Sequence, residues 1–357
     1  MGEAEIIRLH DHRTKPAPDD ERNRCAATTA TGRPCRNFSL PDGEYCSIHA
    51  RDGAAAQRRH PAQGNRHAGS PPAPAREPEP SRNLFDGVAH FVRRRLDGSY
   101  PIDDFGYDPD LHREMLLPLQ RPLYERYFRV RTLGIDRIPA TGAALLVGNH
   151  SGTIPVDAIM VQHAVATEHP RHRTVRNVAA DLAFHMPFVG HLARKTGNAV
   201  ACDEDAHELL HRGELVGVYP EGYKGVGKGW KERYKLQRFG RGGFIEIALR
   251  TRTPIVPVAI VGAEEAFPMI ANAKLLARAF GFPYFPITPT FPLLGPLGLL
   301  PLPSRWLIEF GEPIPMDDYP EDAAEDAMLV FDLSDRIRDT IQQMLYRNLA
   351  LRGRPFI

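Results

Sequence analysis

The sequence predicts an α/β protein whose mixed, largely parallel sheet is flanked by helices. The globular part begins at about residue 83 with helical segments, and from about residue 128 apolar runs of strand length alternate with segments of helical periodicity, the order that builds parallel sheets. With 357 residues, the chain is long enough to bury a full core. Before this part, three of the four cysteines lie within the first 50 residues, and a stretch rich in Ala, Pro and Arg follows them. We therefore expect a disordered tail over 1–22, a small zinc module over 23–50, a disordered linker over 51–82 and the α/β domain over 83–357.

Four side chains near the N-terminus suit a zinc ion. They form the pattern Cys-x9-Cys-x10-Cys-x2-His and are Cys25, Cys35, Cys46 and His49. Three thiolates and one imidazole make a closed tetrahedral set, which indicates a structural zinc ion or a surface for a protein partner rather than a catalytic metal. Residues 24–49 resemble small zinc-binding modules with an Arg-Cys-x-Ala-Thr-Thr start. The alternative is a disordered tail with scattered cysteines.

The linker prediction for residues 51–82 depends on the near absence of large apolar side chains, which cannot offset the entropy of ordering. The next segment, 84–96, has apolar residues at helical spacing with three consecutive arginines, 93–95, among them. Such a helix lies either on an anionic membrane surface or on the protein core. A second helix is expected over 110–126, disturbed by Pro118 and Pro122.

The remaining elements follow from apolar runs and helical periodicity. The expected strands are 128–133, 143–148, 175–179, 215–219, 255–261 and 306–310. The expected helices are 156–165, 182–195, 205–211, 243–251 and 321–349.

One strand–helix junction carries a histidine and a carboxylate. Residues 148–157 read Gly-Asn-His-Ser-Gly-Thr-Ile-Pro-Val-Asp, which places His150 just after a strand and Asp157 at the start of a helix. A histidine oriented by a carboxylate acts as a general base toward a hydroxyl. The other interpretation is a capped helix start, in which Asn149, Ser151 and Asp157 satisfy backbone donors.

A second polar block follows the strand expected over 215–219. Pro220, Glu221 and Gly222 lead into a basic, glycine-rich loop from which we select Lys224, Lys228 and Arg238 as candidate substrate-binding residues. Glycines allow close backbone approach, and Lys and Arg suit phosphate oxygens. We expect the Glu221 carboxylate either to pair with a basic side chain or to accept a hydrogen bond from a substrate hydroxyl. The loop does not have the nucleotide P-loop pattern, and a solvated basic loop is the alternative.

The segment 282–303 is apolar and uncharged, but its seven prolines exclude a regular helix. We expect it either to dip into a membrane interface or line an acyl-chain groove, or to be buried beneath the C-terminal helix. The net charge of +1 does not favour nucleic-acid binding. The sequence has neither a secretory signal pattern nor an apolar run of about 18 residues, so we expect a cytoplasmic protein, peripheral on the inner face of a membrane.

The ordered motifs resemble those of the glycerolipid and lysophospholipid acyltransferase superfamily, in the branch with monoacylglycerol and diacylglycerol acyltransferase-like proteins. The resemblance covers roughly residues 110–350. It is carried by His150 with Asp157, by the Pro220–Gly222 block and by the Val-Pro-Val run around Pro257. It implies the α/β fold of that superfamily, a catalytic His150 oriented by Asp157, and an acceptor-binding role for Glu221 and Gly222.

The implied reaction moves a fatty acyl group from a thioester, acyl-CoA or acyl-carrier protein, to a hydroxyl of a glycerolipid or lysophospholipid, as in phospholipid biosynthesis. The backbone amides of Ser151 and Gly152, with Asn149 beside them, are expected to contact the substrate and its oxyanion. Two features depart from the family. Six residues separate His150 from Asp157 instead of four, and the intermediate motif, 197–203, has no arginine for a phosphate.

Two other functions remain open at this level. The first is a lipid esterase or thioesterase using the same histidine, although a Gly-x-Ser-x-Gly elbow is absent. The second is a non-catalytic lipid-binding protein whose zinc module recruits a protein partner.

Overall fold

The structure is a computed structural model, and it describes residues 79–356 except 82, 153, 187 and 241. The predicted zinc ligands Cys25, Cys35, Cys46 and His49 lie outside the described residues, as do the predicted tail and all but the end of the predicted linker. The zinc module therefore stays a prediction.

A seven-stranded mixed sheet forms the centre of the fold, in the order β1-β9-β6-β2-β5-β3-β4. Its strands are β1 (Arg131–Leu133), β2 (Ala144–Gly148), β3 (Val175–Ala179), β4 (Ala199–Val200), β5 (Leu215–Val218), β6 (Ile255–Val261) and β9 (Leu307–Phe310). All neighbouring strands are parallel except β6 and β9. The predicted mixed, largely parallel sheet is thus confirmed, and the two-residue β4 is an addition too short for a sequence pattern to indicate.

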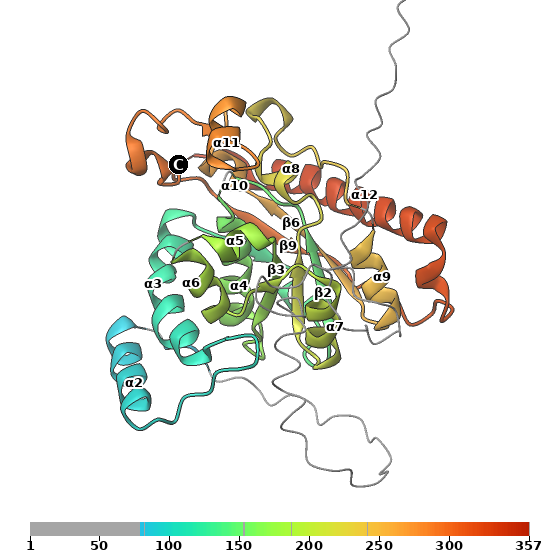
Figure 1. The fold of residues 1–357 in the computed structure, drawn as a ribbon, viewed down its shortest axis with the longest axis horizontal. Coiled ribbons are helices and arrows are strands. Elements are labelled where there is room, and N and C mark those ends of the chain that lie inside the picture. The colour runs from blue at the N-terminus through green and yellow to red at the C-terminus, as the bar shows by residue number, and fades with distance from the viewer. Residues whose placement is uncertain (1–78, 82, 153, 187, 241, 357) are drawn as a thin grey trace, which may run out of the picture. The chain divides into compact units, whose positions relative to one another are not determined.

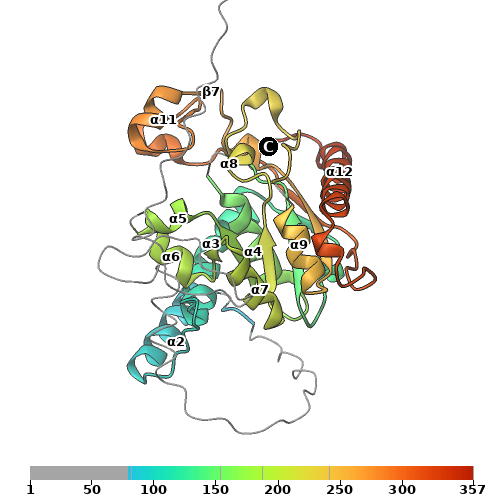
Figure 2. The same cartoon turned by 45° about the vertical axis from the view of Figure 1, so that its right-hand side comes forward.

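Helices cover both faces of the sheet (Figure 1). The main ones are α4 (Val156–Glu168), α7 (Asp203–His211), α9 (Gly243–Arg250) and α12 (Ala327–Arg352). Alternate residues of β2 point to opposite faces. Leu145 and Val147 belong to the core that includes α7, α9 and α12, whereas Leu146 packs with α4. Figure 2 shows α9 and α12 on the same side of the sheet.

Shorter elements connect these layers. They are α5 (Asp181–His185), α6 (Val189–Lys195), α8 (Tyr223–Val226), α10 (Ala263–Ala266), α11 (Lys274–Phe280), the hairpin β7 (Ala271–Asn272) and β8 (Pro286–Ile287), and the 3-10 turns η4 (Ile135–Arg137), η5 (Trp230–Glu232), η6 (Gly295–Leu299) and η7 (Ala323–Glu325). The single helix predicted over 182–195 was wrong. Two helices form instead, because the backbone is extended at Met186 and has a φ of 63° at Phe188.

The region before the sheet is helical. It contains α2 (Leu84–Leu96), η2 (Leu111–Leu116), α3 (Leu117–Pro122) and η3 (Leu123–Tyr127), and both η elements here are π-helices. A proline cannot donate the regular helical hydrogen bond, so wide turns flank Pro118 and Pro122. The helix α2 packs closely on η2, since a side chain at Gly87 would meet the carbonyl oxygen of Glu114. Its other side exposes Phe85 and Leu96 to solvent.

Two buried histidines, His112 in η2 and His163 in α4, make the fold sensitive to acid. Burial lowers the pKa of His112 and of His163 from 6.5 to about 4. Above pH 6.5 neither is protonated in the folded or the unfolded chain. As the pH falls toward 4, the unfolded chain binds protons that the folded chain does not, so stability is lost.

We expect each of these histidines to cost about 2 kcal/mol of unfolding free energy between pH 7 and pH 5. Urea titrations at the two pH values measure this loss. The rings of His163 and Tyr124 are tilted by 32° with their centroids 4.4 Å apart, so His163→Phe keeps a ring contact and should reduce the loss. Equal losses in both proteins would contradict the assignment.

Across the described part of the chain, none of the helices has the length and apolar character needed to cross a bilayer.

Candidate active site

The predicted residues His150 and Glu221, together with Glu264, which was not predicted, follow the carboxyl ends of three adjacent strands. In the sheet, β2 lies between β5 and β6 and is parallel to both. His150 follows β2, Glu221 follows β5, and Glu264 follows β6. Because parallel strands end at the same edge, side chains from distant segments of the sequence meet there.

His150 and Asp157 form a hydrogen-bonded pair. The distance between His150 Nδ1 and Asp157 Oδ2 is 2.9 Å. Asp157 is fully buried, whereas 16% of the His150 side chain is exposed. An ionised carboxylate only accepts hydrogen bonds, so it holds the proton on Nδ1 and leaves Nε2 as the basic nitrogen. The structure thus brings together the two residues expected to form the base and its orienting partner.

The six-residue spacing is accommodated by a tight turn. The N–H of Ser151 donates to Asp157 Oδ2 at 2.8 Å, so the carboxylate holds the turn as well as the imidazole. Gly152 has a φ of 75°, which favours glycine, and a Cβ there would lie 2.6 Å from the carbonyl oxygen of Ala263. Since the Ser151 amide is already committed, its predicted role as an oxyanion donor is not supported by this geometry. Of the two predicted amides, that of Gly152 is the remaining candidate.

Asn149 lies inside the protein rather than at the surface expected for a substrate contact. Its Nδ2 donates to the carbonyl oxygen of Ile260 at 3.0 Å, and its Oδ1 accepts from the Ile260 amide at 2.7 Å. The side chain is fully buried. We therefore correct its role to that of a tether, which extends the pairing of β2 with β6 by one residue and fixes the start of the His150 turn.

Glu221 is also buried, and both of its carboxylate oxygens are used within the protein. Oε1 accepts from the backbone N–H of His150 at 3.0 Å, and Oε2 accepts from the N–H of Gln237 at 2.7 Å. Lys228 Nζ lies 3.2 Å from Oε2. Of the two alternatives for Glu221, the structure favours pairing with a basic side chain over contact with a substrate hydroxyl.

The basic loop does not gather its charges into one binding site. Lys228 is buried, Lys224 is exposed, and the guanidinium of Arg238 lies over the Phe331 ring on α12 at 5.4 Å. Gly222 is exposed and has a φ of 52°. The binding of a substrate phosphate by Lys224, Lys228 and Arg238 together is therefore not supported.

Two tyrosines near His150 were not selected from the sequence. The ring of Tyr219 stacks on the imidazole with centroids 4.8 Å apart, and burial together with the charge of Asp157 raises its pKa. Burial, with a smaller effect of Asp157, also raises the pKa of Tyr284 to about 12. Tyr284 brings the proline-rich segment to the site. An aromatic residue just before Pro220-Glu221-Gly222 was the available signal for Tyr219, whereas nothing local indicated Tyr284.

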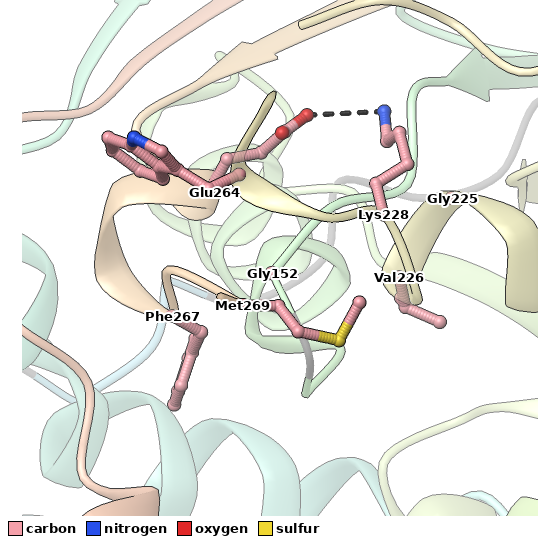
Figure 3. A pocket seen from close by; sticks show the side chains of 8 residues that line it. Gly152, Gly225, Val226, Lys228, Glu264, Phe267 and Met269 are labelled. Carbon is pink, nitrogen blue, oxygen red and sulfur yellow. Dashed lines mark ion pairs between the residues drawn. The ribbon is translucent and has the colours of Figure 1, made fainter. Parts of the chain in front are cut away.

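A small hollow lies behind the Gly152 turn (Figure 3). It measures about 10 Å³ and is lined by Gly152, Gly225, Val226, Lys228, Trp230, Glu264, Phe267 and Met269. This volume suits about one water molecule. Within the described residues, no cluster of His, Cys, Asp and Glu forms a candidate metal site.

Comparison with known proteins agrees with these motifs. The family model described as "Acyltransferase" matches residues 129–261. The "DGAT1/2-independent enzyme synthesizing storage lipids" of Bos taurus is 25% identical over 62% of this chain and 60% of that protein. Among solved structures, the 1-acyl-sn-glycerophosphate acyltransferase PlsC of Thermotoga maritima is similar with a TM-score of 0.46 and 17% identity, over 76% of this chain and 90% of that chain.

Closer relatives come from mycobacteria. An uncharacterized protein of Mycobacterium tuberculosis is 53% identical over 279 residues, which are 78% of this chain and 78% of that protein. One of Mycobacterium leprae is 53% identical over 75% of this chain and 73% of that protein. Together with the family model, this similarity shows that the chain belongs to the acyltransferase family and is an acyltransferase.

Proposed function

We propose that the protein transfers a fatty acyl group from a thioester, acyl-CoA or acyl-carrier protein, to a glycerolipid or lysophospholipid hydroxyl. The observation that carries this proposal is the 2.9 Å contact between His150 Nδ1 and buried Asp157, with the imidazole partly exposed. A base that is oriented from one side and open on the other is suited to a hydroxyl that arrives from outside.

In this mechanism His150 Nε2 takes the proton from the acceptor hydroxyl as its oxygen attacks the thioester carbonyl carbon. The charge on the resulting imidazolium is balanced by Asp157. The tetrahedral oxyanion then collapses, the carbon–sulfur bond breaks, and the imidazolium returns its proton to the leaving thiolate. The Gly152 amide is our candidate donor to the oxyanion.

The site suits an uncharged acylglycerol as acceptor better than a phosphorylated lipid. Lys228 is held by carboxylates and Arg238 lies against α12, so neither is presented to a phosphate beside His150. The mammalian relative's name refers to storage lipids, which supports the same choice.

Release of free CoA from acyl-CoA tests the proposal. We expect release that depends on an added acylglycerol, with lysophosphatidic acid a poorer acceptor. Release of CoA that does not depend on the acceptor would identify a thioesterase. If neither free CoA from acyl-CoA nor free carrier protein from acyl-carrier protein is released, a lipid-binding protein would be favoured.

We also propose that the protein contacts a membrane through an apolar surface near the site. Figure 1 places α8, α10 and α11 at the same end of the sheet. Beyond α11, Leu293, Leu297 and Leu300 are 84%, 68% and 62% exposed, so the interpretation of 282–303 as a buried loop is wrong. Exposed leucines grouped in this way are typical of an interaction surface.

The triple change Leu293→Asp, Leu297→Asp and Leu300→Asp should abolish flotation with phospholipid vesicles, because three charges would enter the interface. Met328→Asp with Leu351→Asp is a matched control, since both residues are exposed on α12. Equal flotation of the triple variant and the wild type would rule out this surface.

The N-terminal module is proposed to hold one structural zinc ion. Plasma emission spectrometry of the dialysed full-length chain should find about one zinc per chain, as a closed set of three thiolates and one imidazole requires. Cys25→Ser with Cys46→Ser should remove it, whereas Cys202→Ser should not. Zinc retained by the double variant would contradict the assignment.

A further inference from the structure

A buried lysine lies between two glutamates behind the His150 turn. Lys228 Nζ is 3.2 Å from Glu221 Oε2 and 3.2 Å from Glu264 Oε1, and all three side chains are buried. Figure 3 shows the pair of Lys228 and Glu264 near Gly152. Glu221 follows β5 and Glu264 follows β6. The ammonium therefore joins the strand ends on both sides of the strand that carries His150.

This cluster of Lys228, Glu221 and Glu264, called the Lys228 cluster below, is connected to the base through the backbone. Glu221 accepts the His150 amide hydrogen at 3.0 Å. The two segments also lie very close together, because a Cβ at Gly225 would be 2.6 Å from the carbonyl oxygen of His150. A shift of Glu221 would therefore shift the turn that aims the imidazole.

The charge of Lys228 keeps this arrangement stable. Burial alone would lower the pKa of Lys228. The carboxylates of Glu264 and Glu221 raise it by more than burial lowers it, so the pKa lies above the ordinary value. Burial raises the pKa of Glu264, and Lys228 opposes that effect. Without the ammonium, two buried carboxylates would face each other, and Glu264 would take up a proton or the two groups would separate.

Two further charged groups lie next to the Lys228 cluster, and they pair with each other. Arg352 donates to both oxygens of Glu265, at 2.9 and 3.0 Å. Tyr234 donates its amide hydrogen to Glu264 at 3.0 Å and its hydroxyl hydrogen to Glu265. Arg352 and Glu265 therefore balance each other, and Lys228 is the basic group that faces Glu221 and Glu264.

We propose that Lys228 is a positioning residue for the transfer reaction, because it keeps Glu221 in place against the backbone of His150. This inference rests on the proposed function of His150 as the base. The contacts of Lys228 Nζ are to Glu221, Glu264 and the carbonyl oxygen of Lys235, so its role in the transfer is to position.

The test compares transfer kinetics of Lys228→Met with the wild type. At pH 8 we expect kcat to fall about 10-fold or more, with the acceptor KM changed by less than about 2-fold. The ratio of variant to wild-type kcat should rise as the pH is lowered to 6, since protonation of Glu264 removes the repulsion. Lys228→Arg should restore most of the activity. Adding Glu264→Gln to Lys228→Met should restore part of the activity, because it removes the repulsion between the two buried carboxylates, and the effects of the two changes are then not additive.

A lysine with an ion pair elsewhere is the control. Lys195 Nζ lies 3.3 Å from Asp108 Oδ2, at the end of α6, so Lys195→Met removes a structural ion pair and should leave the pH dependence unchanged. The same pH dependence in Lys195→Met and Lys228→Met would overturn the proposal, as would failure of the Glu264→Gln addition to restore activity. If Lys228→Met does not fold, the activities of Lys228→Arg and of the double variant Lys228→Met with Glu264→Gln still test the positioning role.

Amide hydrogen exchange tests the same contact without any turnover. In Lys228→Met the His150 amide should exchange about 10-fold faster or more, because its acceptor is no longer held in place. Unchanged exchange would overturn the positioning role even if transfer is slow. A wild-type protein without transfer activity would instead refute the proposed function, while the exchange result still decides the role of Lys228.

Discussion

Replacing His150 by alanine is expected to lower the transfer rate by about 10³-fold, the usual contribution of a positioned general base. The substitution removes the only part of the His–Asp pair that reaches the exposed side of the site. Asp157 keeps its bonds to the amides of Ser151 and Ala158, so the unfolding free energy should fall by only about 1 kcal/mol. Acceptor-dependent CoA release and urea denaturation measure the two effects.

Matched changes separate catalysis from folding. His207→Ala on α7 removes an exposed imidazole away from the site and should leave the rate unchanged. Asp157→Asn keeps the size of the orienting group but removes its charge, so we expect a large fall in the rate with a greater loss of stability. Full activity of His150→Ala would refute the assignment of the base.

Replacing Asn149 by alanine should have the largest effect on stability among the site residues. It leaves the Ile260 amide and carbonyl without their present partners in a buried location. Unpaired buried groups cost about 1–3 kcal/mol each, so we expect a loss of about 2–4 kcal/mol of unfolding free energy. Transfer should also slow, because the turn that holds His150 begins at this residue.

Asn272→Ala provides the comparison for Asn149. Asn272 is exposed, and its Oδ1 accepts one backbone hydrogen bond, from Phe285 at 3.1 Å. Its loss should cost under about 1 kcal/mol, since water replaces the partner. Similar unfolding midpoints for the two variants would show that the Asn149 tether contributes little.

The sheet was predictable because strands of a buried parallel sheet appear in the sequence as short continuous runs of apolar residues. The ranges predicted for β3 and β6 match the structure at both ends. The antiparallel pairing of β9 with β6 was not predictable. Both strands are apolar runs in the sequence, and such a run does not show whether a strand is parallel or antiparallel to its neighbour. The division of α5 from α6 depended on a local backbone conformation at Phe188 that the apolar spacing does not reveal.

For the site, local order in the sequence was informative and distant contacts were not. His150 and Asp157 lie within one turn, so their meeting needed only a sharp reversal, which Gly152 permits. Lys228 looked like part of an exposed basic loop, because its partner Glu264 comes from a different strand end 36 residues later. The two adjacent glutamates after a strand of seven buried residues were the missed signal, since such carboxylates need partners.

The hollow behind Gly152 has a consequence for how the enzyme would distinguish fatty acids. At about 10 Å³ it cannot receive even a short hydrocarbon tail, so it cannot act as a ruler that measures chain length. If the tails instead remain among the lipids while only the ester-forming ends reach His150, acyl groups of many lengths should react at similar rates. The composition of the product would then follow the supply of acyl donors more than the size of this hollow.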